Sequence, residues 1–343
     1  MGHLTYALRL PCADRLDCAG TGRVHTSNAP YDPAEVRWIV QSRRSLAAEG
    51  VVGRVHRAFA SNEEIARAKP SVVPACLRST GTIDLSLARR AGGVSLRRAF
   101  QSGCLRLRLP RRHEEGEHPC AVLINTGGGL AEGDRIEQRV HWGEDSVATI
   151  ATQAAEKVYR ALARGSEIST RLEVARGAHA EWLPQETILF DQARLRREAR
   201  IVLAEDVIFL GVEAVVLGRQ AMGETVRQGA LRDRMRIWRN GRLVYADTLA
   251  LDGNIARLME SAAIGGGARA MAVLLHASDR ALAFLEPVRD ALRTAEGLAA
   301  ASAWNGLLAV RLLAPDGETL RHDIAAALAV LREGRPLPRV WRC

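Results

Sequence analysis

The sequence repeats one short pattern at SVATIATQ (residues 146–153), AHAEWLPQ (residues 178–185) and DVIFLGVE (residues 206–213). Each segment starts at a turn, continues as a short apolar strand, and ends in a polar side chain seven positions after a small or acidic residue. These polar side chains are 32 and then 28 positions apart, a period compatible with stacked coils of strand. Chance similarity between β segments is the alternative. A true repeat predicts a helix-like, solenoid-like stack of β-strands.

Strand signals extend outward from this repeat. Asn240-Gly241 predicts a hairpin, because both residues accept the positive φ angles of a type I′ turn. Short alternating apolar runs, bounded by Gly, Pro or charged residues, predict further strands: Thr82–Leu87, Cys104–Leu109, Ala121–Ile124, Ser169–Val174, Arg200–Leu203 and Arg234–Trp238. Residues 77–265 are therefore expected to form a mainly β body.

A different pattern follows Gly265-Gly266-Gly267. Strand patterns now alternate with helical spacing, and basic residues lie near the end of the last helical stretch. The predicted order is a strand at Ala270–Leu275, a helix within Asp279–Glu296, a strand at Gly306–Leu313 and a helix at Leu320–Arg332. Residues 266–343 thus predict a small α/β segment packed on the β body.

Residues 1–76 lack a sustained period of either 2 or 3.6 residues. Their short apolar pieces are broken by Gly, Pro, Ser and Asn, which predicts a disordered or loosely attached extension. A misassigned start codon is the alternative. Cysteine and histidine residues occur here, but their spacing matches no standard zinc pattern.

Composition limits the class of protein. The chain has 343 residues, of which 47% are hydrophobic and 25% charged, as in globular proteins with a sizeable core. Charged residues interrupt every apolar run before it could cross a bilayer, and residues 1–10 do not form a signal peptide. The net charge of +9 comes with interleaved charges and 4% aromatic residues, which argues against nucleic-acid binding. We expect a cytoplasmic protein that binds neither membrane nor nucleic acid.

Catalytic motifs are missing from the sequence. The glycines at 127–129 follow a predicted strand, but their register does not fit a dinucleotide fingerprint, and no Gly-Lys-Ser/Thr follows them. They are expected to permit a sharp turn and close packing of strands. The sequence has no Gly-x-Ser-x-Gly motif for a nucleophilic serine. The protein is therefore expected not to be an enzyme.

Two kinds of polar side chain are candidates for metal handling. The run from His113 to Cys120 offers imidazole, carboxylate and thiolate groups on a loop, with a solvated turn as the alternative. Glu181, Glu186 and Glu213 lie within apolar stretches, where a buried carboxylate is costly unless it is paired or binds a cation. The sequence leaves two interpretations of these carboxylates open, structural ion pairs with arginine and a polar path through the protein.

Several blocks of the sequence resemble the signature blocks of the UreD family of urease accessory proteins. The matching blocks are GGGLAEGD at 127–134, TIATQAAEKVYR at 149–160, EWLPQETILF at 181–190, LGRQAMGE at 217–224 and LPRVWRC at 337–343. The resemblance extends from about Thr80 to the C-terminus, and residues 1–76 have no counterpart in it.

This resemblance implies a β-rich stack of strands that acts as a scaffold, or chaperone, in nickel insertion. Such a protein binds the urease apoprotein and, through the accessory protein UreF, recruits the GTPase UreG. It also implies an internal nickel path, with no tightly bound cofactor and only transient Ni²⁺. The polar lining of that path is expected to be Asp134, Glu181, Glu186, Glu213 and Glu224.

A rival reading is a β-solenoid hydrolase that uses paired carboxylates as acid and base. Glu181 together with Glu186 or Glu213 would form the pair.

Overall fold

The computed structural model describes residues 78–91, 93–111 and 117–342. The predictions for residues 1–76 lie outside the described residues, as does the part of the His113–Cys120 run before Glu117.

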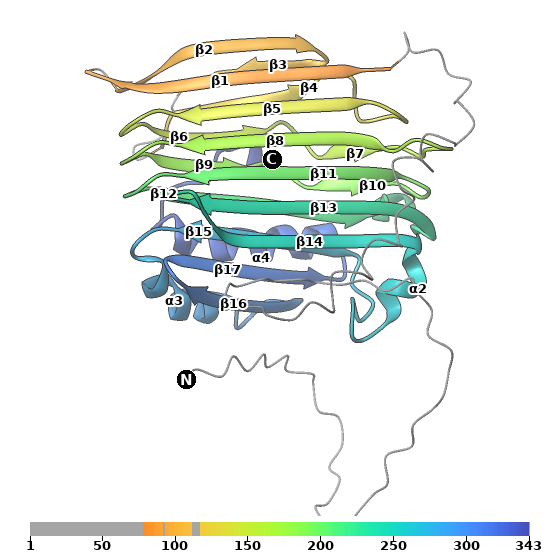
Figure 1. The fold of residues 1–343 in the computed structure, drawn as a ribbon. Coiled ribbons are helices and arrows are strands. Elements are labelled where there is room, and N and C mark those ends of the chain that lie inside the picture. The colour runs from red at the N-terminus through yellow and green to blue at the C-terminus, as the bar shows by residue number, and fades with distance from the viewer. Residues whose placement is uncertain (1–77, 92, 112–116, 343) are drawn as a thin grey trace, which may run out of the picture. The chain divides into compact units, whose positions relative to one another are not determined.

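Long strands stack side by side in a first sheet, called sheet A (Figure 1). The strands from β1 to β13 are parallel to their neighbours, while β2 and β14 are antiparallel hairpin partners at the two edges. The spatial order is β14 (Arg242–Asn254), β13 (Gln228–Arg239), β11 (Arg194–Leu203), β8 (Ser166–Val174), β5 (Arg135–Trp142), β1 (Thr80–Arg90) and β2 (Gly93–Gly103).

A second sheet, sheet B, stacks alongside the first. Its strands β4, β6, β9 and β12 are parallel, and its remaining main strands are antiparallel. The order is β16 (Leu298–Trp304), β17 (Leu307–Ala314), β15 (Ala270–Ala277), β12 (Ile208–Leu217), β9 (His179–Leu183), β6 (Val147–Thr152), β4 (Cys120–Asn125) and β3 (Leu105–Arg108). The short strands β7 (Glu156–Val158) and β10 (Thr187–Leu189) pair with each other, and β10 also pairs with β12.

The chain passes from sheet A to sheet B and back in successive coils, which makes a β-solenoid of about 4 turns. The repeat seen in the sequence matches part of the register of these coils. Val147 of β6 pairs with His179 of β9, 32 positions later, as in the repeat. His179 pairs in turn with Ile208, 29 positions later and one position off the repeat, whereas Thr187 of β10 pairs with Val215, 28 positions later. The predicted helix-like stack of strands is confirmed.

Short helices accompany the C-terminal strands. These are α2 (Ile255–Glu260), α3 (Leu285–Ala291) and α4 (Gly317–Leu331), with 3-10 turns η3 (Gln220–Met222), η4 (Ala281–Phe284) and η5 (Arg339–Trp341). The side chain of Asp316 caps α4 by accepting from the backbone N–H of Thr319 at 2.7 Å, as N-cap residues do. The small C-terminal α/β segment is confirmed, and α4 packs on β15 and β17.

The helix predicted within Asp279–Glu296 is shorter in the structure than its sequence pattern suggests. A 3-10 turn, η4, comes first, and α3 then ends at Ala291. Strand β16 was not predicted, since its alanine-rich sequence has low strand propensity. Its pairing follows from the turn at Asn305-Gly306, where both φ angles are positive, 48° and 73°. This is the same hairpin signal that correctly predicted the turn at Asn240-Gly241.

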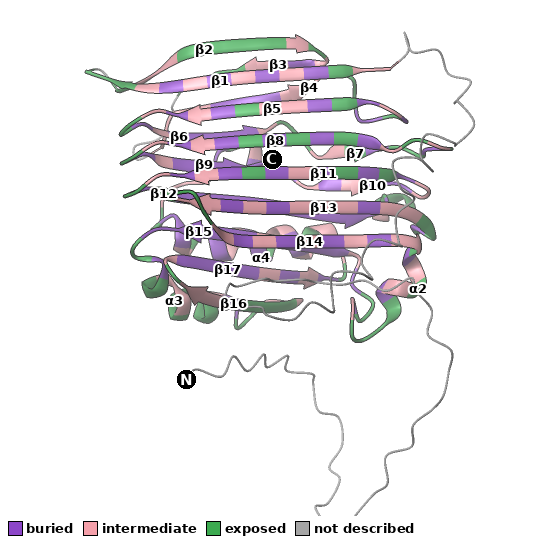
Figure 2. Ribbon diagram, viewed as in Figure 1, coloured by how far each residue is buried: buried purple, intermediate pink, exposed green. Residues whose placement is uncertain are grey.

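Two hydrophobic cores lie on opposite faces of sheet B. Phe209 and Val215 of β12 belong to the inner core, between the two sheets. Leu210 and Val212 belong to the outer core, which includes α4. Because successive side chains of a strand point to opposite faces, the buried apolar residues of β9 and β12 divide between the two cores. Figure 2 shows the contrast with edge strand β2, which is largely exposed.

Candidate functional site

A column of polar side chains crosses the outer face of sheet B. Cys120 of β4 pairs in register with Thr149 of β6, and Thr149 pairs with Glu181 of β9. Glu181 has no exposed surface. His179 shares its face of β9, two residues away, as does Leu183, which lies in the outer core. Strand alternation therefore places a buried carboxylate and an imidazole together beneath the C-terminal residues.

Glu181 is held by two arginines that follow α4. Arg332 donates from Nε to Oε1 and from Nη2 to Oε2, both at 3.1 Å, and Arg335 donates from Nη1 to Oε1 at 3.0 Å. The hydroxyl of Thr149 also donates to Oε2. Burial would raise the pKa of Glu181, but Arg332, Thr149 and Arg335 outweigh it and lower that pKa to about 2. The carboxylate is ionised, and both of its oxygens accept hydrogen bonds.

Two imidazoles complete this cluster. The rings of His118 and His179 lie edge to face, 4.6 Å apart between centroids. Arg335 Nη1 lies 2.9 Å from His118 Nδ1, and Arg335 Nη2 lies 3.4 Å from His179 Nε2. Burial lowers the pKa of both histidines to about 4, although Glu181 opposes this. One ligand atom from each of His118, His179 and Glu181 lies within 4.8 Å of the others.

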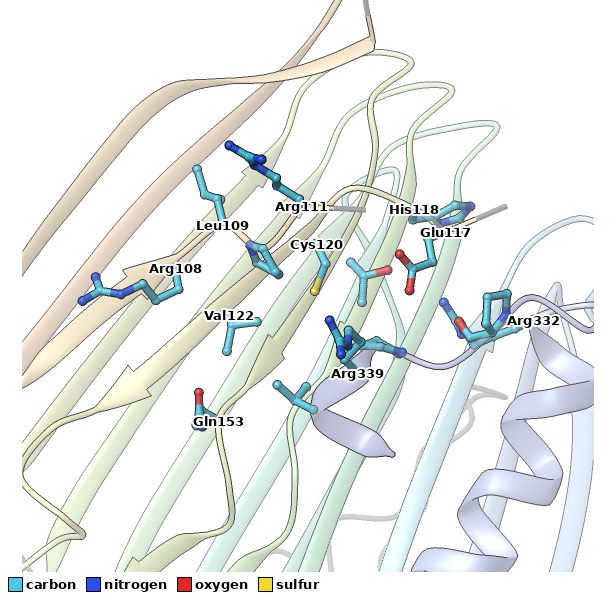
Figure 3. Close-up of a pocket in the computed structure, with 15 residues that line it drawn as sticks. Arg108, Leu109, Arg111, Glu117, His118, Cys120, Val122, Gln153, Arg332 and Arg339 are labelled. Carbon is cyan, nitrogen blue, oxygen red and sulfur yellow. The ribbon is translucent and has the colours of Figure 1, made fainter. Parts of the chain in front are cut away.

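A pocket of about 280 Å³ opens beside the cluster. Figure 3 shows Arg332 and Arg339 of the C-terminal residues on one side, and Cys120 and His118 on the other. Burial raises the pKa of the Cys120 thiol to about 12, so it stays protonated at neutral pH and is a poor nucleophile. The charged groups in the lining of the pocket are four guanidinium groups and the carboxylate of Glu117, beside apolar side chains.

The C-terminal residues beside this pocket are hydrogen-bonded to sheet B and the loop that follows β9. Trp341 is 5% exposed, and its indole N–H donates to the carbonyl of Leu183 at 2.9 Å. The side-chain amide of Gln185 donates to the carbonyl of Val340. Residues about 155 positions apart are therefore brought together, and the walls of the pocket depend on this contact.

Glu213 lies in the interior, on the opposite face of sheet B from Glu181. Arg197 Nη1 approaches its carboxylate at 2.6 Å, and the indole N–H of Trp182 donates to it at 3.1 Å. Arg197 also donates from Nε to Asp233 at 3.0 Å. Burial opposes ionisation of Arg197, but Asp233 and Glu213 outweigh it and raise its pKa. Burial raises the pKa of Glu213, against the attraction of Arg197.

Two pockets between the sheets adjoin this ion pair. One, of about 170 Å³, is lined by Glu156 and Asn125 as well as Arg197 and Glu213. The other, of about 30 Å³, shares Arg197 and Glu213 and reaches Asp247. Burial raises the pKa of Glu156 to about 7, although the amide of Asn125 donates to both of its oxygens, at 3.1 and 3.2 Å. Polar groups thus extend between the sheets.

The other predicted site residues lie elsewhere. Glu186 pairs with Arg321 of α4 at 3.1 Å. Glu224 pairs with Arg219 at 2.9 Å. Asp134 accepts from two backbone N–H groups, at 2.7 and 2.8 Å, which fixes a turn.

The five predicted residues therefore do not gather at one place. Four of them, Glu181, Glu186, Glu213 and Glu224, form ion pairs with arginine, as one of the two sequence interpretations expected. Sequence reasoning missed His179 and Glu156. The spacing His179-x-Glu181 within a predicted strand was a usable signal, because it places both side chains on one face.

The glycine-rich turn at 127–129 has the role expected from the sequence. Gly129 has φ +145°, and a Cβ there would lie 2.8 Å from the carbonyl oxygen of Lys157 and 2.7 Å from the ring of Tyr159. Close approach of two strands therefore requires glycine.

Among the residues that the structure describes, none of the helices has both the length and the apolar character needed to span a bilayer.

The fold and these contacts define a β-solenoid protein with a buried ion-pair cluster on each face of sheet B. A family model described as UreD urease accessory protein matches residues 79–342. The urease accessory protein UreD of Rhizobium etli is 45% identical over 264 residues, covering 77% of this chain and 95% of the relative. That of Methylobacterium sp. (strain 4-46) is 47% identical over 272 residues, covering 77% and 95%.

The chain belongs to the UreD family of urease accessory proteins, which implies a role in urease maturation.

Proposed function

We propose that this protein is a scaffold for nickel insertion into apo-urease. It binds the urease apoprotein and links it, through UreF, to the GTPase UreG, which supplies the hydrolysis. Membership of the UreD family supports the place in urease maturation. The sequence supports the division of labour, because it has no phosphate-binding loop of its own.

The proposal includes an internal path for Ni²⁺ between the two sheets. The observation that carries it is the pair of pockets between the sheets that share Arg197 and Glu213. A solenoid interior is normally filled by apolar side chains, and buried carboxylates there are costly. Glu156, Glu213 and Asp247 supply oxygen ligands along this space. A moving ion needs several weak sites, because an ion held tightly at one place does not leave it.

Glu213→Gln tests this path without removing the main partner of Arg197. Arg197 remains paired with Asp233, which it contacts through two nitrogens, so the fold should survive the loss of Glu213. The variant is expected to co-purify with urease and the other accessory proteins. It should activate urease poorly at limiting nickel, with partial rescue at high nickel.

The matched control is Glu198→Gln on β11, the strand that carries Arg197. Glu198 pairs with Arg236 on the exposed face of sheet A, with 43% of its side chain exposed. This control should activate urease as wild type does. Wild-type activation by Glu213→Gln at limiting nickel would contradict the path. Failure of Glu213→Gln to co-purify with urease would instead assign Glu213 to assembly.

The hydrolase reading is not favoured. An acid and a base must reach one substrate bond from a shared cleft. Glu181 faces the outer core and Glu213 the inner core, on opposite faces of sheet B, and both are engaged by arginine.

A further inference from the structure

The His118, His179 and Glu181 cluster is organised around a single positive group, the guanidinium of Arg335. This guanidinium lies within hydrogen-bond distance of all three side chains: Nη1 is 2.9 Å from His118 Nδ1, 2.6 Å from His118 Nε2 and 3.0 Å from Glu181 Oε1, and Nη2 is 3.4 Å from His179 Nε2. One ligand atom from each of His118, His179 and Glu181 lies within 4.8 Å of the others, and Arg335 lies against all three residues.

Two imidazoles and one carboxylate form a ligand set that suits divalent zinc, nickel or cobalt. Arg335 supplies only one positive charge to these three side chains. A divalent ion bound by the same three side chains would leave coordination positions open to water.

We propose that His118, His179 and Glu181 form a binding site for a divalent cation of the zinc, nickel and cobalt class, which Arg335 occupies in this structure and vacates when the ion binds. The second arginine, Arg332, keeps its two contacts with Glu181. It holds the carboxylate in place and, as a nearby positive charge, keeps the bound ion exchangeable.

The surroundings of Arg335 allow this exchange. Its side chain is 19% exposed, whereas that of Arg332 is 2% exposed. Arg335 follows a turn in which Glu333 and Gly334 both have positive φ angles, 52° and 78°, so it lies outside α4. The adjacent pocket of about 280 Å³, lined by His118 and Thr149, gives an ion access from solvent.

This site is separate from the internal path. It faces the outer core, while Glu213 and its cavities face the inner core on the other side of sheet B. The cation site therefore does not depend on the proposed function, and either one can fail without the other.

The test is Co²⁺ binding to the purified full-length chain, followed by the visible absorption of the bound ion and by calorimetry. Arg335→Met removes the competing guanidinium and keeps an apolar side chain of similar length. If Arg335 fills the site nine-tenths of the time, its removal should tighten Co²⁺ binding about tenfold. His118→Asn and His179→Asn, each made in the Arg335→Met background, should weaken binding at least about tenfold.

The matched control is His141→Ala in the same background. His141 lies on β5 of sheet A, where it pairs with Glu173 at 3.6 Å and is 46% exposed. It should leave Co²⁺ binding unchanged, which separates the proposed site from other histidine and cysteine residues of the chain. Broadening of the His118 and His179 ring signals by Co²⁺ in NMR spectra gives a second measurement. The proposal fails if Arg335→Met binds Co²⁺ no more tightly than wild type, or if neither histidine substitution weakens binding and neither ring signal broadens.

Discussion

Carboxylates that look alike in the sequence have different environments in the fold. Glu181 and Glu186 are five positions apart, yet Glu181 is fully buried against Arg332, while the Glu186 side chain keeps 21% of its surface exposed beside Arg321. An ion pair in partial contact with water contributes little to stability. Breaking a fully buried pair leaves an uncompensated charge.

We therefore expect Glu181→Gln to lower the free energy of unfolding by about 3 kcal/mol, because Arg332 loses its buried carboxylate. Glu186→Gln should cost less than about 1 kcal/mol. Chemical denaturation of both variants beside wild type measures the difference. Equal losses would contradict the assignment of Glu181 as the buried partner.

Glu156 should make stability depend on pH. Its pKa is raised from 4.5 to about 7 by burial, so the folded protein favours the protonated carboxyl. The stabilisation from that proton is complete below about pH 4.5 and is lost as the pH rises through 7. Glu156→Gln carries a permanently neutral group and should be more stable than wild type by about 3 kcal/mol at pH 8.

The two proteins should have the same stability near pH 4.5. The measurement is the free energy of unfolding of both between pH 4.5 and 8. A constant difference across that range would show that Glu156 titrates at its ordinary pKa.

At the scale of elements, the contact between the C-terminal turn η5 and strand β9 holds the chain after α4 against the outer face of sheet B. Trp341 fills the outer core and bonds to Leu183 of β9. Trp341→Ala should cost about 3 to 5 kcal/mol, and it should loosen the chain after α4 before it affects the solenoid.

Hydrogen exchange measures this effect. Amides of residues 332–342 should exchange faster in Trp341→Ala, while those of β8 in sheet A should exchange at the wild-type rate. Uniform acceleration over both sheets would mean that the C-terminal residues and the solenoid unfold as one unit.

At the scale of the whole molecule, we propose that residues 1–76 are dispensable. The family match begins at residue 79, and 95% of the Rhizobium etli relative is covered by a match to 77% of this chain. A protein lacking residues 1–76 should therefore have the wild-type melting temperature within a few degrees and should support urease activation. Lost activation by a truncated protein of unchanged stability would assign residues 1–76 a binding role.

The sequence by itself predicted the solenoid, although strands β9 and β12 pair one position off the repeat. The repeat of about 30 residues, the alternating strands and the Asn-Gly turn are local patterns. Each arises from residues that are close together in the sequence, whose backbone preferences and apolar spacing favour a strand or a turn. The sequence also singled out Glu181 and Glu213 as carboxylates in apolar surroundings. Strand β16 was missed because its pairing with β17, rather than its own propensity, makes it a strand.

Only the tertiary structure decided what those carboxylates do. Arg332 lies 151 positions from Glu181, and Arg335 and His118 meet only because the residues after α4 fold back over sheet B. Which face of sheet B a side chain occupies depends on the alignment of whole coils. Partners that are far apart in the sequence leave no periodic signal, because their contact is set by the packing of complete layers rather than by neighbouring residues.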